Sequence, residues 1–436
     1  NIHSMVSSVI IKVAGIYGLL RFIYEFLPRE PWEGPIILIV AACTALIGVF
    51  NALISHDLKT ALANHSVENI GIILAGIGLN LSLGGNNFPG AYLALLASLY
   101  HLMNHSIFKS LLFMCTGAIE KLTGTVALEK LGGLIHSHRG VAILFIVGSV
   151  AISGFPPFNG FISEWLLLQA FLSGLSNGQP STWVLISMVI ALTMLSLSFG
   201  LTALAFSKIC GEVLLGRPRE NQQSKNQRTP AQMWVPMSVF ALICLLLGLF
   251  PGTVVKQLSF ITERIIGVVD ISTTDNIVPA LVDNIVSPIL LMLLFSVVLI
   301  FILYRYLKKG LIKVDNSSWN CGTAYQPATM RITGSAYGSL LWERFSKKLT
   351  QSEITNEQTD SQDVIPWQIF MSTARFVIEG SRYRINKVAK TVIRASNQFG
   401  SKFQNGDIRS YVIYLYVLFL AILIAIPLVM SLILKE

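Results

Sequence analysis

The sequence predicts an all-α polytopic membrane protein, and three observations carry that prediction. Of its 436 residues, 53% are hydrophobic and only 13% are charged, with a mean hydropathy of +0.64, whereas soluble domains carry about 25% charged residues. The apolar residues occur in runs of about 20, long enough to cross a hydrocarbon core of roughly 30 Å as helices. Two shorter runs flank a pair of prolines, which indicates an interrupted helix inside the membrane.

Ten apolar runs are the expected spans, in chain order 4–27, 35–55, 60–84, 92–119, 141–156, 160–174, 182–207, 233–250, 287–307 and 411–434. The fifth and sixth are about 15 residues each and cover only roughly 22 Å. Between them lies Gly154–Gly160, whose two prolines remove backbone donors and exclude helix from the residues before them. Non-helical backbone at membrane depth survives only where protein or a wet cavity covers it. The sequence therefore predicts a discontinuous helix here.

Basic side chains gather in two connections, one between the seventh and eighth spans and one in residues 308–410. Cytoplasmic loops are the ones enriched in Lys and Arg, so we expect both connections in the cytoplasm. Counting ten separate crossings then places the start and the far C-terminus outside. The net charge of +9 is expected to attract anionic lipid and not nucleic acid. We therefore expect a multi-pass protein of the bacterial inner (plasma) membrane, and its start lacks the pattern of a signal peptide.

These features divide the chain into three regions: a transmembrane bundle over 1–307, a basic cytoplasmic stretch over 308–410, and a C-terminal transmembrane helix over 411–436. Within the second region, Lys347–Asp363 is polar enough to be disordered. Trp367–Phe403 carries apolar residues at helical spacing among basic ones. That pattern fits an amphipathic helix on the membrane or on a neighbouring subunit, and it fits a solvated charged helix equally well.

No cofactor or metal site is expected. The five cysteines are scattered without a CxxC pair, which argues against the usual iron–sulfur and zinc patterns. The sequence has no glycine-rich nucleotide fingerprint after a strand, no P-loop and no haem-attachment motif. If the protein serves an oxidoreductase, we expect the electrons to travel through other subunits.

The strongest functional signal lies in the span 92–119, where His101, His105 and Lys109 follow one another at intervals of four residues. That spacing puts them on one helix face, about 6 Å apart, so a proton passing between them needs water or another polar group. Histidine titrates near neutrality, and a desolvated lysine can be shifted toward it. The alternative is that the histidines bond backbone carbonyls and the lysine snorkels to a headgroup. The mid-span position favours a functional role, because an intramembrane charge costs about 2.5–3.5 kcal/mol.

A second group surrounds the junction of the second and third spans. Lys59 begins the third span, and His65 and Glu68 lie on its first turns. A cation at a helix start opposes the helix dipole, so Lys59 requires a countercharge, for which Glu68 is a candidate. A purely structural role is the alternative, but the apolar surroundings favour proton transport.

Two further ionisable residues lie in apolar runs. Glu164 follows the proline pair by seven residues, one turn into a helix whose free N-terminal amides favour a carboxylate. A capping role is the alternative, and transport is favoured. Lys12 lies within the first span, where a functional and a structural role are equally favoured.

Together these residues predict a proton path along the membrane midplane, from Lys59 through His101, His105 and Lys109 to Glu164. Two unit charges about 6 Å apart interact by roughly 3 kcal/mol at an effective dielectric of 20. Moving one charge through 100 mV is worth about 2.3 kcal/mol. Forming or separating one ion pair can therefore load or release a proton on a neighbouring group against the field.

Two stretches of the sequence resemble the proton-translocating, Mrp-antiporter-like membrane subunits of respiratory complex I and its relatives. They are HDLKTALANHSVENIGIILAGIGL, from His56, and YHLMNHSIFKSLLFMCTGAI, from Tyr100. The stretch SGFPPFNGFISEWLLLQAF is similar to the broken helix of that family. The forms VENIGII and FISEW, with WNCGTAYQPATMRITGSAYGSLL after the ninth span, resemble more narrowly the branch of hydrogenase-4 component B and formate hydrogenlyase subunit 3.

The resemblance implies a fold of about fourteen core helices, built as two inverted repeats that each contain a broken helix. It also implies roles, with Lys59 as a bridging lysine, His101 and His105 as central relay residues, Lys109 as the central lysine and Glu164 as the terminal ionisable group. Complex I subunits often carry lysine where Glu164 stands. The first repeat of the family is expected before Asn1, so we expect the chain to be the C-terminal part of an antiporter-like subunit.

Three functions are compatible with the sequence. The first is a proton-translocating membrane subunit of a hydrogenase-4-type or NADH:quinone oxidoreductase-related complex, which works with other membrane subunits and soluble redox subunits. The second is a subunit of a Mrp-type cation/proton antiporter, which would exchange Na+ for protons. The third is a membrane anchor or ion-coupling subunit of an ion- or carbon-accumulating complex. The WNCG segment favours the first.

Overall fold

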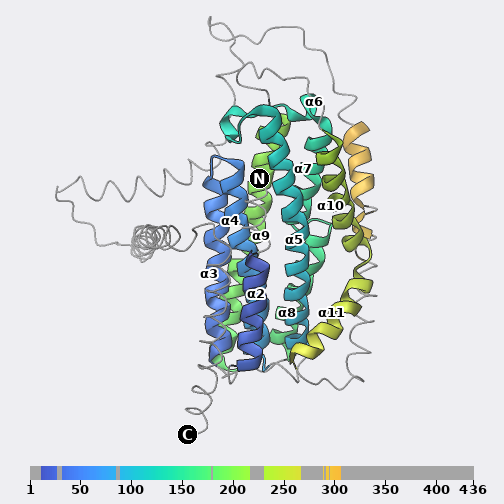
Figure 1. The fold of residues 1–436 in the computed structure, drawn as a ribbon. Helices are drawn as coiled ribbons and strands as arrows, with labels where there is room; N and C mark the ends of the chain where they lie inside the picture. Colours follow the sequence, from blue (N-terminus) through green and yellow to red (C-terminus); the bar gives the residue numbers. More distant parts are fainter. Residues whose placement is uncertain are drawn as a thin grey trace, which may run out of the picture. The chain divides into compact units, whose positions relative to one another are not determined.

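The computed structural model describes residues 11–26, 32–84, 89–177, 180–216 and 230–266, together with parts of 288–305. All of them belong to one compact unit, Asn1–Arg344. Within these ranges the chain is helical between short turns, apart from one isolated β-bridge between Asp57 and Ala127. The predicted all-α fold is therefore confirmed over the described part of the chain (Figure 1). The predicted regions 308–410 and 411–436 lie outside it.

The described elements follow one another as an up-and-down set of helices. In chain order they are α2 (Ile11–Arg21) with a π-helical end, η2 (Phe22–Phe26), α3 (Glu33–Ile54), α4 (Leu58–Ser82), α5 (Pro89–Thr123), η3 (Leu128–Lys130), α6 (Leu134–Ser137), α7 (Arg139–Ile152), α8 (Asn159–Asn177), α9 (Thr182–Ile209) with a π-helical end, η4 (Cys210–Leu215), α10 (Ala231–Leu249) and α11 (Pro251–Ile266).

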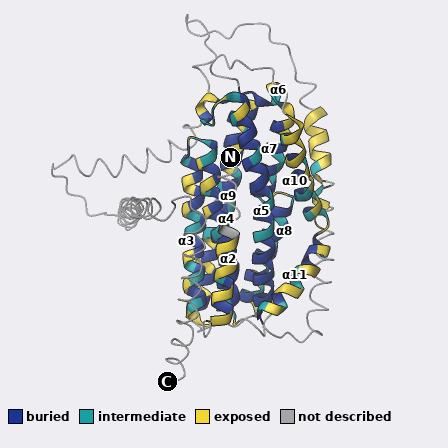
Figure 2. Ribbon diagram, in the orientation of Figure 1, coloured by how far each residue is buried: buried dark blue, intermediate teal, exposed yellow. Residues whose placement is uncertain are grey.

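Three of the described helices are long and apolar enough to cross a membrane, namely α3, α9 extended to Leu215, and α10. The 25-residue α4 and the 35-residue α5 are also long enough, but they carry buried polar side chains that lower their hydropathy. Large apolar side chains such as Val40, Val189 and Val239 are exposed on the outer faces of α3, α9 and α10 (Figure 2). Exposed apolar surface on this scale suits hydrocarbon and not water, as expected of a multi-pass membrane protein.

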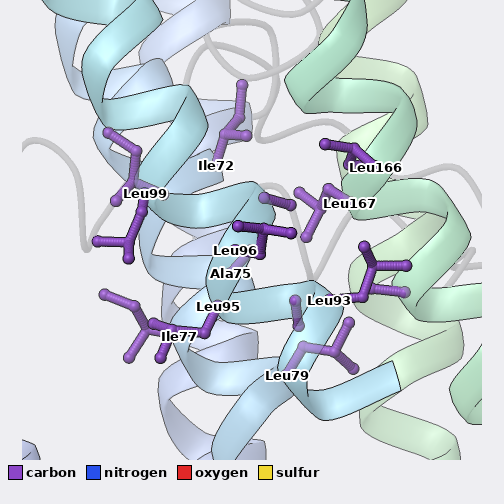
Figure 3. Close-up of a cluster of buried hydrophobic side chains, with 14 of the residues drawn as sticks. Ile72, Ala75, Ile77, Leu79, Leu93, Leu95, Leu96, Leu99, Leu166 and Leu167 are labelled. Atoms are coloured by element: carbon purple, nitrogen blue, oxygen red, sulfur yellow. The ribbon is translucent and has the colours of Figure 1, made fainter. Parts of the chain in front are cut away.

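The centre of the bundle is formed by α4 and α5, with α3, α8 and α9 packed around them. Leucine and isoleucine side chains fill the space between α4, α5 and α8, as Figure 3 shows for Ile77, Leu93, Leu96 and Leu167. Small side chains such as Ala41 and Ala45 on α3 let that helix approach α4 closely, which is the usual way that helices associate without a hydrophobic driving force.

The predicted discontinuous helix is confirmed, but it makes one crossing and not two. Along the partner helix α5, Gly148 of α7 lies against Leu112, and Asn159 at the start of α8 bonds Asn104. Helix α8 therefore continues in the direction of α7 after the break, as Figure 1 also shows. The prediction of separate spans at 141–156 and 160–174 is wrong, because two prolines interrupt a helix without reversing the chain.

Because α7 and α8 make one crossing and not two, the structure changes which helix ends share a face of the bundle. Separate spans would place the ends of α3 and α9 on opposite faces. In the structure, Lys208 Nζ at the end of α9 donates to the carbonyl of Leu53 at the end of α3, at 2.8 Å. At the end of α2, Tyr24 bonds Asn80 near the opposite end of α4. Helix α2 therefore runs away from the face where the basic connection after α9 begins. The beginning of α2 and that connection thus lie on the same face, and not on opposite faces as a count of separate crossings requires.

A second interruption lies beside the first, at the junction of α10 and α11. The side chain of Tyr100 donates to the carbonyl of Leu247 at 2.7 Å. Gly248 lies directly against the backbone of Pro157 and Phe158, where a larger residue would overlap. Helix α11 begins at Pro251, and it also packs on α5. The hydropathy pattern predicts no span over this helix, because its apolar residues are too few.

Candidate functional site

A set of buried polar side chains follows the inside of the bundle on α4, α5, α8 and α9. Each is less than 5% exposed, and they comprise His65, Glu68, Asn69, His101, Asn104, His105, Lys109, Asn159, Ser163, Ser198, Thr202 and Lys208. Burying one polar group without a partner costs roughly 1–3 kcal/mol, so a set of this size persists only where its members bond one another or serve a function.

Helix α5 places His101, His105 and Lys109 on one buried face, as their spacing predicts. All three are at most 2% exposed. Lys109 Nζ donates to the carbonyl of Leu62 on α4 at 2.6 Å and lies 5.9 Å from the centroid of the Phe113 ring. The alternative that this lysine snorkels to a headgroup is wrong, because its side chain is fully enclosed by the bundle.

Helix α4 contributes a buried pair in which His65 Nδ1 lies 2.6 Å from Glu68 Oε2. The other carboxylate oxygen of Glu68 accepts hydrogen bonds from Ser198, at 3.2 Å, and from Thr202, both on α9. The imidazole of His65 also stacks on the Phe206 ring, with centroids 4.6 Å apart. The carboxylate therefore joins α4 to α9 inside the bundle.

Lys59 has a different countercharge from the one expected. Its Nζ donates to Glu120 Oε1 on α5 at 2.6 Å, so the prediction that Glu68 pairs with it is wrong. Nine residues of helix separate Lys59 from Glu68, which is about 13 Å of rise and half a turn of rotation, beyond the reach of a side-chain pair. The Lys59 and Glu120 side chains are 33% and 36% exposed, so this pair lies at the edge of the site.

The turn before α4 explains how a cation is accepted at that helix start. Asp57 caps the helix by accepting hydrogen bonds from the Lys59 and Thr60 backbone amides, at 2.7 and 3.0 Å. Its backbone pairs with Ala127 in the isolated β-bridge. The cap and Glu120 together supply the negative charge that a helix N-terminus favours.

His101 links three helices through its two ring nitrogens. Its Nε2 lies 3.1 Å from Asn69 Oδ1 on α4, and its Nδ1 lies 2.9 Å from Ser163 Oγ on α8. Asn104 donates to the same serine oxygen at 3.0 Å. His105, one turn along α5, is fully buried with its ring edge-on to Phe108.

Glu164 is positioned by the helix break. Its partly buried carboxylate lies against Gly154, which follows the C-cap residue Ser153 of α7 and has a φ of +65°. A Cβ atom at Gly154 would overlap the carboxylate. Glu164 also lies close enough to Glu68 for the two carboxylates to repel each other electrostatically. In the described part of the chain, no hydrogen bond or ion pair involves the Glu164 carboxylate.

Several site residues were missed or misplaced by the sequence. Lys208 follows the predicted span 182–207 and so falls in the predicted basic connection, but in the structure it belongs to α9 and is 4% exposed. Glu212 follows one turn later, buried in the π-helical end. The pair at spacing i, i+4 inside an apolar run is the signal that could have revealed them. Glu120, Asn69 and Ser163 carry no such signal, because their partners are distant in sequence.

Two predictions remain, one on Lys12 and one on metal binding. Lys12 lies in α2, but its side chain is outside the described residues. Among the residues that the structure describes, no group of three or more His, Cys, Asp or Glu could hold a metal ion.

The sequence of this chain is similar to a family of membrane proteins and to several of its named relatives. Residues 2–207 match the family model of the NADH:quinone oxidoreductase/Mrp antiporter transmembrane domain. The chain is similar to hydrogenase-4 component B of Escherichia coli, with 29% identity over 97% of this chain and 64% of that protein. It is also similar to formate hydrogenlyase subunit 3 of the same organism, with 33% identity over 59% of this chain and 42% of that protein. The chain thus spans less than two thirds of these relatives.

Among solved structures, the chain resembles one in the membrane-bound sulfane sulfur reductase, an archaeal respiratory membrane complex. The TM-score is 0.51 at 18% identity, covering 90% of this chain and 56% of that one. This likeness bears on the fold alone.

Proposed function

We propose that this chain, whose residues 2–207 match the family model of the NADH:quinone oxidoreductase/Mrp antiporter transmembrane domain, is a proton-translocating subunit of a larger membrane complex. In the proposal, protons move along its buried Lys, His and Glu side chains, and the chain carries no electrons. The observation that supports it most is the polar network that runs from α9 through α4 and α5 to α8, at the level of the helix break.

The network has the properties that a proton path needs. Its carboxylate, Glu68, contacts His65 on one side and two hydroxyl groups on the other. Its central imidazole, His101, has a polar partner at each ring nitrogen. Protons can therefore be held at defined atoms. Low-dielectric surroundings let a charge at one site act strongly on the next.

One charged pair at the edge of the network supplies the driving force in this proposal. Lys59 forms an ion pair with Glu120 at its edge, and Lys109 lies buried at its centre. In the proposed cycle, separating the Lys59–Glu120 pair changes the electrostatic potential at Lys109. Glu120 lies eleven residues from Lys109 on α5, about 16 Å of rise. At an effective dielectric of 20, a unit charge at that distance changes the energy of Lys109 by about 1 kcal/mol, which is part of the roughly 2.3 kcal/mol of moving a charge through 100 mV.

We further propose that the parent complex is of the hydrogenase-4 type, or a related quinone oxidoreductase, in a bacterial inner membrane. The similarity to hydrogenase-4 component B over nearly the whole chain supports this assignment. Partners would be other membrane subunits and soluble redox subunits that hold the electron carriers.

A second candidate is a subunit of a Mrp-type cation/proton antiporter, which the family description itself includes. The two functions differ in what drives the proton. In the first, acidification of membrane vesicles requires electron transfer through the complex. In the second, a Na+ or K+ gradient suffices.

The proposal is tested with inverted membrane vesicles that contain the native complex. The variant Lys109→Met removes the buried cation, and Lys121→Met removes an exposed lysine near the end of the same helix. We expect electron-driven acidification to fall at least tenfold with Lys109→Met and to be unchanged with Lys121→Met, because only the first loses a charge in the network. Acidification by Na+ alone, without an electron donor, would support the antiporter and contradict the first candidate.

A further inference from the structure

The hydrogen bonds around His101 determine which of its ring nitrogens is free to exchange a proton. On one side, Asn69 Nδ2 donates to the carbonyl of His65 at 2.7 Å. Because a carbonyl can only accept, this bond orients the amide with its oxygen toward His101 Nε2, 3.1 Å away. An amide oxygen also only accepts. Nε2 therefore carries a hydrogen whether the ring is neutral or charged.

On the other side, Ser163 can both donate and accept. Its Oγ lies 2.9 Å from His101 Nδ1 and 3.1 Å from the carbonyl of Gly160. Asn104 Nδ2 donates to it at 3.0 Å, and the same Nδ2 donates to the carbonyl of Asn159 at 2.8 Å, which orients that amide. The serine hydrogen thus has two alternative acceptors, the imidazole nitrogen and a backbone oxygen.

We infer that His101 takes up and releases the transported proton at Nδ1, against Ser163, while Asn69 keeps a hydrogen on Nε2. The inference rests on the proposed function and makes Asn69 and Ser163 positioning residues. In the neutral ring, the serine hydroxyl donates to Nδ1. A proton delivered by hydronium binds the Nδ1 lone pair and leaves water behind. The new N–H then donates to Ser163 Oγ, and the hydroxyl turns to Gly160.

Release reverses these steps: the Nδ1–H bond breaks, its electron pair stays on nitrogen, and water accepts the proton. Both ring nitrogens and the serine oxygen keep hydrogen-bond partners in both states, so only hydrogens have to move. A charged imidazole that donates both of its hydrogens avoids the cost of an unpaired buried donor.

The inference also gives the relay a direction. Proton exchange at Nδ1 faces α8 and the helix break, on the side of Glu164. The Asn69 amide separates His101 from His65 and Glu68 on α4, so this pair acts on His101 through its charge and not by direct proton transfer. On α5 itself, His105 packs against the same Phe108 ring as His101 does.

A spectroscopic experiment tests the tautomer without any transport. The native complex is labelled with 15N-histidine, and the His101 signals are assigned by difference from the His101→Gln variant. We expect the neutral ring to show a protonated Nε2 and an unprotonated Nδ1. A neutral ring with its hydrogen on Nδ1 would overturn the inference. This result is independent of whether the complex moves protons, so it separates failure of the inference from failure of the proposed function.

Transport variants test the positioning roles. Ser163→Ala should lower electron-driven proton uptake about tenfold, the effect of one lost hydrogen bond, and Ser163→Thr should restore most of it because the hydroxyl returns. Asn69→Leu should shift the His101 signal toward the other tautomer. The control is Ser187→Ala, which removes a buried hydroxyl on α9 that bonds the Val184 carbonyl. Uptake by Ser163→Ala equal to that of Ser187→Ala, at unchanged electron transfer, would overturn the serine's role.

Discussion

At the scale of single residues, the site depends on hydroxyl and amide groups that orient the ionisable ones. Glu68 is 1% exposed, and a carboxylate at that depth needs charge-assisted hydrogen bonds. It obtains them from His65 on its own helix and from Ser198 and Thr202 on α9. The hydroxyl groups thus let a charge exist inside the membrane where hydrocarbon alone would exclude it.

The first prediction concerns Thr202. Replacing it by valine keeps the shape of the side chain but removes a hydrogen bond to the carboxylate, which is worth about 1.5–3 kcal/mol when the acceptor is charged. We expect Thr202→Val to slow electron-driven proton uptake about tenfold or more, measured as the initial rate in inverted vesicles. Thr193→Val is the control, because its hydroxyl bonds only the Val189 carbonyl of the same helix. Equal rates in the two variants would contradict this role for Thr202.

The sequence located the ionisable residues better than their partners. The spacing of His101, His105 and Lys109 predicted one buried face, because helical periodicity is a local property. The partner of Lys59 was predicted wrongly, because Glu120 lies on another helix and its approach depends on how α4 and α5 pack. Ser163 was not singled out at all, since a serine beside a glutamate has no signature until the histidine opposite is known.

At the scale of elements, the helix break is the feature that sets the geometry of the site. The break lets α8 begin at Asn159, at the level of Asn104 on α5, and it brings Gly154 against the Glu164 carboxylate. The proline pair made the interruption predictable. The direction of the chain after it was not, because two short helices can reverse or continue with equal helical propensity.

The second prediction tests how Gly154 positions the acid. Gly154→Ala must pay about 1 kcal/mol for a left-handed backbone and must also displace the Glu164 carboxylate. We expect lower thermal stability of the complex and impaired proton uptake. Gly84→Ala is the matched control, since Gly84 has φ of +81° but no atom within 4 Å of a new Cβ. If both variants lose the same stability and neither loses transport, the close approach of Gly154 to the Glu164 carboxylate does not contribute to proton transport.

At the scale of the whole described bundle, the single interrupted crossing determines which loops share a side of the membrane. The ends of α3, α5 and α9 lie together, through the Lys208–Leu53 hydrogen bond and the Lys59–Glu120 ion pair. Counting apolar runs gave one crossing too many, since a hydropathy pattern records how long each run is and not whether the chain turns back.

The third prediction is a labelling pattern. In a background whose five native cysteines are replaced by alanine, Lys130→Cys and Gly216→Cys should react with a membrane-impermeant thiol reagent from the same side. Gly84→Cys should react from the opposite side. We expect the first side to be cytoplasmic, because the basic connection follows Gly216. Reaction of Lys130→Cys and Gly216→Cys from opposite sides would restore the two-crossing topology and contradict the structure.

The central claim is that protons pass through the buried network of this chain, and the number of protons translocated per electron tests it most directly. The ratio is measured in inverted vesicles with wild-type, Lys109→Met and Lys121→Met complexes, so that a slower enzyme is not mistaken for an uncoupled one. We predict a lower ratio for Lys109→Met and the wild-type ratio for Lys121→Met. A Lys109→Met complex that translocates protons at the wild-type ratio would contradict the claim.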